Sequence, residues 1–117
     1  MAFYQSVNLI RIIGILGGMG PIATGKFIPG ILALYQKDHG VFQDGEYPKT
    51  AIYSISPKGS NESGIKANNL LERKFLSGVK ELDKTSADFI TIPCNTAHHY
   101  IDRMRNVAKA PIISITE

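Results

Sequence analysis

The chain has 117 residues, of which 44% are hydrophobic and 20% charged, a composition typical of one small globular domain rather than of a disordered segment. Its net charge of +3 comes from 13 lysines and arginines scattered along the sequence, which argues against a nucleic-acid surface. The single cysteine excludes an internal disulfide and favours a reducing, cytoplasmic compartment. The apolar stretch 9–23 contains Arg11 and is too short to span a bilayer, so no membrane segment is predicted.

Strand-like and helix-like segments alternate along the sequence. In chain order, the predicted elements are a strand over 10–16, a helix over 22–36, a strand over 50–55, a helix over 65–84, a strand over 88–93, a helix over 96–108 and a strand over 111–115. Pro29 lies inside the first helix and predicts a kink or a restart there, because proline lacks the backbone N–H that a helix uses. Segments 39–49 and 56–64 are rich in turn formers and predict loops. The charged residues of 62–84 are interpreted as a solvated helix face.

The order β-α-β-α-β-α-β predicts a single α/β domain over residues 1–117, with a parallel sheet and flanking helices. Ligands of such sheets bind beyond the carboxyl ends of the strands. The loops that begin at Gly17, Ser54 and Pro93 are therefore expected to converge on one edge of the sheet.

Cys94 lies between the third predicted strand and the helix that follows it. Backbone N–H groups at a helix start favour an anion, so this position suits a reactive thiolate. Asn95 and Thr96 offer donors for a carboxylate, although Thr96 could equally be only the N-cap of the helix. His98 or His99 could orient or protonate the thiol. The alternatives are a buried, inert cysteine and two surface histidines, and the spacing does not fit a zinc site.

The other two loops carry weaker signals. The glycines of 17–21 allow backbone N–H groups to approach an anion, or they form only a tight turn between strand and helix. Their spacing matches neither a dinucleotide fingerprint nor a P-loop. Ser54 ends the second predicted strand and Lys58 follows it; this lysine could neutralise a substrate carboxylate, or it belongs to a solvated loop.

Two motifs together resemble the aspartate/glutamate racemase superfamily, most of all its aspartate racemase branch. They are IGILGGMGPIAT at residues 13–24 and ADFITIPCNTAH at 87–98, and PIISITE at 111–117 is similar to the strand that follows in that family. The resemblance implies two pseudo-symmetric α/β halves that face each other across a cleft, each with one cysteine. One thiolate removes the α-proton of aspartate or glutamate and the other thiol returns a proton to the opposite face, without pyridoxal phosphate or a metal.

The resemblance also implies roles for individual residues. Cys94 would be the acid/base group of the first half, Asn95 and Thr96 would bind the α-carboxylate, and Met19 and Gly20 would line the pocket. The sequence departs from the family in two ways. It matches the N-terminal half only, so the second cysteine is missing, and the loop after the second strand has no arginine for the distal carboxylate. Lys58 is at most a point-charge substitute for that arginine.

Three functional interpretations follow from these departures. The chain is one half of an amino-acid racemase, truncated and inactive or nearly so by itself. Alternatively, two copies form a homodimer that brings two Cys94 thiols together. A third interpretation is a non-catalytic module that binds a carboxylate or an amino acid, or that serves as an interaction domain.

Overall fold

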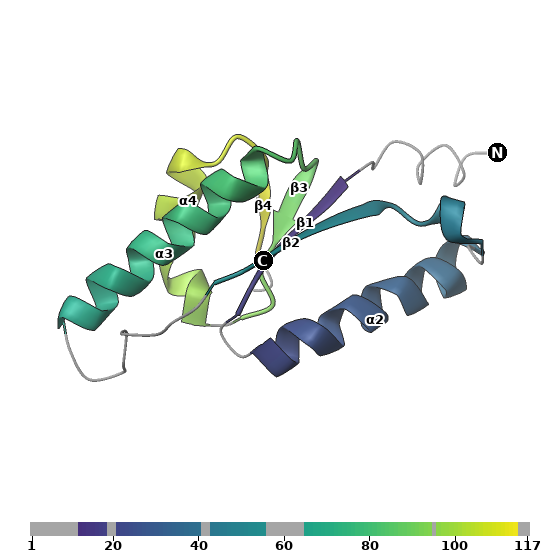
Figure 1. The fold of residues 1–117 in the computed structure, drawn as a ribbon, viewed down its shortest axis with the longest axis horizontal. Coiled ribbons are helices and arrows are strands. Elements are labelled where there is room, and N and C mark those ends of the chain that lie inside the picture. Colours follow the sequence, from purple (N-terminus) through teal and green to yellow (C-terminus); the bar gives the residue numbers. More distant parts are fainter. Residues whose placement is uncertain (1–11, 19–20, 41–42, 56–64, 95, 115–117) are drawn as a thin grey trace.

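The computed structural model of the chain describes residues 12–18, 21–40, 43–55, 65–94 and 96–114 (Figure 1). The elements in these ranges are β1 (Ile12–Gly17), α2 (Pro21–His39), η1 (Asp44–Glu46), β2 (Lys49–Ser54), α3 (Ile65–Asp83), β3 (Phe89–Thr91), η2 (Thr96–Tyr100), α4 (Ile101–Val107) and β4 (Ile112–Ile113). The described strands form a parallel sheet in the order β2-β1-β3-β4. Helices α3 and α4 lie on one side of the sheet and α2 on the other (Figure 1). The predicted α/β fold is therefore confirmed.

The main apolar core lies between the sheet and α3. Helix α3 contributes buried side chains three or four residues apart, which places them on one face of the helix. The buried members of this core are Leu16, Ile55, Leu71, Phe75, Val79, Leu82, Ile90, Ile92, Ala97, Met104 and Ile112. Full burial of a large aliphatic or aromatic side chain contributes about 1.5–3 kcal/mol relative to exposure. This core fixes the rotation of α3 about its own axis. That rotation determines which polar residues of α3 face the sheet and which face solvent.

Helix α2 runs from Pro21 to His39 without interruption, so the predicted restart at Pro29 is wrong. Pro29 is exposed, and the hydrogen bonds of the turns on either side maintain the helix although this residue donates none. A kink at Pro29 stays a prediction.

The elements from β3 onward differ in detail from their prediction. Strands β3 and β4 are shorter than predicted, with three and two residues. The backbone N–H of Cys94 donates to the carbonyl of Ile92 at 2.8 Å, which turns the chain away from the sheet. The helix predicted over 96–108 begins as the 3-10 helix η2 and becomes α-helical only at Ile101. The loop predicted over 39–49 contains η1 and the first residue of β2.

None of the described helices has the length and apolar character that crossing a membrane requires.

Candidate functional site at the carboxyl edge of the sheet

Strands β1, β2 and β3 end at the same edge of the sheet. Gly17 at the end of β1 is in register with Ser54 at the end of β2, and Ile15 is in register with Thr91 at the end of β3. The loops that were expected to converge therefore begin side by side. Of the predicted site residues, Ser54, Cys94 and His98 are described with their side chains, and Thr96 is the first residue of η2. Met19, Gly20, Lys58 and Asn95 lie outside the described residues.

Cys94 lies two residues after Ile92, where the chain leaves the sheet. Its side chain is half-buried and packs against the core. Cys94 is therefore neither fully enclosed nor fully solvated. The bond from the Cys94 N–H to the Ile92 carbonyl fixes the start of the turn.

The side chain of His98 contacts the backbone carbonyl group of Cys94. Its Nδ1 lies 2.7 Å from the backbone carbonyl oxygen of Cys94. A carbonyl oxygen can only accept, so Nδ1 is the donor in this contact. The predicted action of His98 on the thiol stays a prediction; the contact observed is with the backbone. Both backbone polar groups of Cys94 are thus engaged, which restricts where its side chain can point.

His99 is exposed, and its ring meets that of Tyr100 edge-on at a centroid distance of 5.1 Å. For His99 the interpretation as a surface histidine fits the structure.

The turn after β1 requires glycine first of all because the backbones at the ends of β1 and β2 pack closely together. Gly18 has φ +108°, and a Cβ at this position would collide with the backbone of Ile55. The N–H of Ile55 donates to the carbonyl of Gly17 at 2.8 Å, so the ends of β1 and β2 stay in contact. The N–H of Gly18 donates to Oγ1 of Thr24 at 3.1 Å and is therefore directed at a side chain of α2. Sequence reasoning missed Thr24, since a buried threonine in the first helical turns carries no distinctive pattern.

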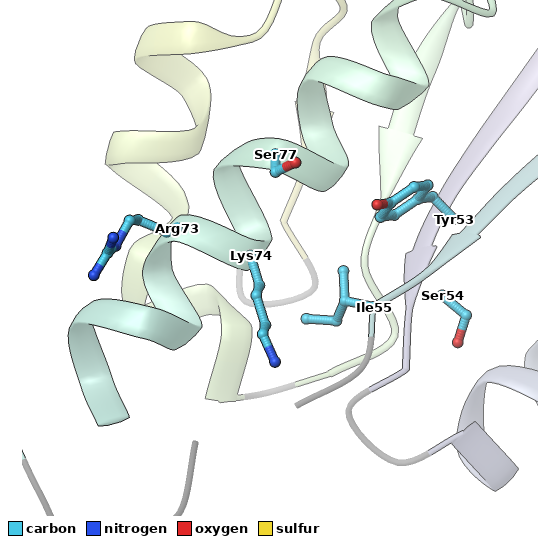
Figure 2. Close-up of a pocket in the computed structure, with 6 residues that line it drawn as sticks. All are labelled: Tyr53, Ser54, Ile55, Arg73, Lys74 and Ser77. Carbon is cyan, nitrogen blue, oxygen red and sulfur yellow. The ribbon is translucent and has the colours of Figure 1, made fainter. Parts of the chain in front are cut away.

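A pocket of about 460 Å³ lies between the end of β2 and α3 (Figure 2). Its described lining residues are Tyr53, Ser54, Ile55, Arg73, Lys74 and Ser77. The interpretation of α3's charged residues as one solvated face is therefore wrong for Lys74, which is half-buried and contributes to the pocket wall. The signal in the sequence for this position is weak: Lys74 lies one helical turn before Gly78, and Gly78 is the residue at which α3 comes close to the sheet.

The described residues contain no group of three histidine, cysteine or acidic side chains that could hold a metal ion.

The chain resembles racemases in both sequence and structure. The family model for Asp/Glu/Hydantoin racemase matches residues 16–117. The broad specificity amino-acid racemase RacX of Bacillus subtilis (strain 168) is 36% identical over 105 residues, which cover 90% of this chain and 46% of that protein.

Among solved structures, an aspartate racemase homologue from Pyrococcus horikoshii OT3 matches with a TM-score of 0.74 at 26% identity, over 91% of this chain and 45% of that one. The aspartate racemase of Picrophilus torridus matches with a TM-score of 0.67 at 27% identity, over 89% of this chain and 43% of that one. The chain thus spans somewhat less than half the length of these relatives. It belongs to the Asp/Glu/Hydantoin racemase family, as its two motifs indicated.

Proposed function

We propose that the chain supplies one of the two acid/base groups of a cofactor-independent amino-acid racemase, and that Cys94 is this group. The observation that carries the proposal is the position of Cys94: a half-buried thiol at the carboxyl end of β3, with its backbone held by Ile92 and His98, in a chain of the racemase family. Ligands of parallel sheets bind at this edge.

The reaction needs a base on one face of the substrate and an acid on the other. The Cys94 thiolate takes the proton from the α-carbon, and the electron pair of the broken C–H bond stays on that carbon as a carbanion. A second thiol then donates its proton to the opposite face. The product is the other enantiomer, with one thiol newly protonated and the other newly ionised.

The remaining roles follow the family resemblance. In this proposal the roles are binding of the α-carboxylate for Asn95 and Thr96, formation of the substrate pocket for Met19 and Gly20, and recognition of the substrate side chain for Ser54 and Lys58. Aspartate and glutamate are the proposed substrates. The second thiol comes from a second half of the racemase fold, or from a second copy of this chain in a homodimer.

The test is hydrogen exchange at the α-carbon. The chain is incubated in D2O with L- or D-aspartate and, separately, glutamate; loss of the Cα–H signal is followed by NMR and the enantiomers are resolved. We expect exchange that Cys94→Ala abolishes and that the exposed-site control His99→Gln leaves unchanged. Exchange with inversion indicates that two thiols meet, and exchange with retention indicates a single competent base.

Exchange that survives Cys94→Ala would contradict the role of Cys94. Absence of exchange at every protein concentration would contradict the active homodimer and would leave two alternatives: one half of a racemase that needs its second half, or a module that only binds an amino acid. A rate that rises with the square of protein concentration would support the homodimer.

A further inference from the structure

Strand β2 forms one side edge of the described sheet. In the strand order β2-β1-β3-β4, its hydrogen-bonded neighbour among the described strands is β1 alone. Helices α2 and α3 lie on opposite sides of the sheet (Figure 1), and five of the six side chains of β2 are exposed. The opposite edge strand, β4, has only two residues. A six-residue open edge presents a row of backbone groups with which a further strand can pair.

The pairing of β2 with β1 determines which backbone groups point outward. The N–H of Ile55 donates to the carbonyl of Gly17 at 2.8 Å and therefore points at β1. Backbone N–H and C=O groups alternate between the two sides of a strand from one residue to the next. The register with β1 is continuous over all of β2. The residues of β2 whose N–H and C=O groups point to the open side are therefore Thr50, Ile52 and Ser54.

These outward groups fit a second copy of β2 that runs antiparallel. With Ile52 opposite the partner's Ile52, Thr50 lies opposite the partner's Ser54, and each of these residue pairs exchanges two backbone hydrogen bonds. A shift in one direction would bring in Pro48, which has no N–H, and a shift in the other would leave Thr50 without a partner in β2. Lys49 is the charged residue of β2, and no like charge lies opposite it in this register.

The side chains that this register places opposite each other are compatible on both faces of the sheet. On the α2 face, Ile52 is 46% exposed and meets its own copy, a pair of β-branched side chains, while the hydroxyls of Thr50 and Ser54 lie across from each other. On the α3 face, the exposed ring of Tyr53 lies opposite the small Ala51 and covers it. Cross-strand pairs of these kinds stabilise a sheet.

We propose that two copies of the chain associate through β2 in this register and form one continuous sheet. The association covers Ile52 and the row of backbone groups that a single copy leaves open. Because the two β2 strands run in opposite directions, the carboxyl ends of the strands in the two copies also point in opposite directions. The two Cys94 thiols then lie at opposite ends of the joined sheet. A copy that is joined through β2 therefore supplies no second thiol, and the interface is independent of the proposed catalysis.

The first test is sedimentation velocity of the 117-residue chain between about 10 µM and 1 mM. We expect a weak, reversible dimer, because one pair of strands buries less surface than a standard interface of about 1,200–2,000 Å². Ile52→Lys should raise the dimer Kd at least about ten-fold, since it removes an apolar pair and places two like charges directly opposite each other. A chain that stays monomeric over the whole range would overturn the proposal.

The matched control is Ile113→Lys. Ile113 is 48% exposed and lies on the same face of the sheet as Ile52, but on the opposite edge strand β4. This variant should leave the dimer Kd unchanged within about two-fold, because residues distant from an interface contribute independently of it. Equal weakening of the dimer by Ile52→Lys and Ile113→Lys would show that general surface hydrophobicity drives association, and would contradict an interface at β2.

The register has a test of its own, which also serves if Ile52→Lys does not fold. Thr50→Lys combined with Ser54→Glu places opposite charges across the interface twice and should lower the dimer Kd about three-fold at low salt. The exchanged pair, Thr50→Glu with Ser54→Lys, should act in the same way, because each position faces the other. Thr50→Lys with Ser54→Lys should weaken the dimer. The same change in Kd for all three double variants would contradict the register.

Amide hydrogen exchange identifies what occupies the edge. The N–H groups of Ile52 and Ser54 should exchange more slowly as the protein concentration rises, whereas those of Ala51 and Tyr53, which point at β1, should be protected at every concentration. Protection of Ile52 and Ser54 at the lowest concentration would show that another part of the same chain covers this edge, and would overturn the proposal.

Failure of this proposal and failure of the proposed function give different results. Ile52→Lys should leave any Cys94-dependent exchange at the substrate α-carbon unchanged, because the two thiols of the β2 dimer do not meet. Loss of α-carbon exchange together with dimerisation in this variant would contradict the separation of the interface from catalysis. Ile52-dependent dimerisation without α-carbon exchange would support the interface and contradict only catalysis by this chain alone.

Discussion

The two faces of the sheet are built differently. On the α3 face, Leu16, Ile90 and Ile92 are at most 1% exposed and pack against a helix that is itself buried along one side. On the α2 face, residues in register with buried Ile15 and Thr91 lie open: Ile52 is 46% exposed and Ile113 is 48% exposed. Helix α2 makes few contacts with the strands among the described residues, and its Ile22 and Leu34 are mostly exposed.

This difference shows that apolar content does not by itself produce a core. Helix α2 is richer in apolar residues than α3, yet α3 has its apolar side chains on one face and α2 does not. A helix with a single apolar face has one favourable way to lie on a sheet. The pocket between β2 and α3 lies on the α3 face, where packing restricts the side chains most strongly.

The largest expected difference between the two faces comes from truncation of large side chains. Phe75→Ala removes a side chain that is 1% exposed and contacts the ring of Tyr100 at a centroid distance of 5.7 Å. We expect a loss of about 3–5 kcal/mol in the free energy of unfolding. Leu34→Ala on α2 should cost less than about 0.5 kcal/mol. Urea unfolding of both variants measures this, and equal losses would contradict the asymmetry.

The second prediction concerns the anchor of α2. Thr24→Val removes the acceptor of the buried Gly18 N–H and should lower the free energy of unfolding by about 1–3 kcal/mol, the cost of an unsatisfied buried donor. Thr24→Ser keeps the hydroxyl and should recover most of this loss. A valine variant as stable as the parent in thermal unfolding would show that this hydrogen bond does not hold α2 to the glycine turn.

Glycine-to-alanine substitution should have opposite signs in the two helices. Gly78→Ala on α3 inserts a Cβ 2.5 Å from Leu16 and 3.1 Å from Tyr53, and we expect a net loss of about 1–2 kcal/mol from overpacking. Gly30→Ala on α2 meets nothing within 4 Å and should stabilise the chain by up to about 1 kcal/mol through helix propensity. Chemical denaturation decides the two signs; a stabilising Gly78→Ala would show that α3 can move off the sheet.

The smallest expected effect is a pH dependence from α2. Burial raises the pKa of Tyr35 above its usual value of 10.0. The folded state therefore holds this proton more tightly than the unfolded state. The contribution of the Tyr35 proton to the free energy of unfolding is complete below pH 10.0. It is lost as the pH rises through the folded-state pKa of Tyr35. Tyr35→Phe should flatten this alkaline decline in unfolding experiments between about pH 9 and 12. If the decline is unchanged in the Tyr35→Phe variant, groups other than Tyr35 cause it.

The order of the elements and the position of the thiol could be predicted from the sequence. Alternating β-branched runs and helical spacings predicted the parallel sheet, and Cys94 was predicted at the end of a strand that the structure ends at Thr91. These features depend on local patterns, which a sequence displays directly. The restart at Pro29 was wrong for a related reason: the local preference of proline was outweighed by the helix around it.

The contacts that define the site required the tertiary structure. The bond from His98 to the Cys94 carbonyl, the bond from Gly18 to Thr24 and the place of Lys74 in the pocket wall all join residues by geometry rather than by pattern. The order of strands β2, β1 and β3 decides which loops meet, and the rotation of α3 decides which of its charges face them. The sequence by itself determined the family, the alternation of strands and helices and the candidate thiol, since these reside in motifs and periodicity. Only the tertiary structure decided which distant side chains surround the site, because that follows from how helices and strands pack against one another.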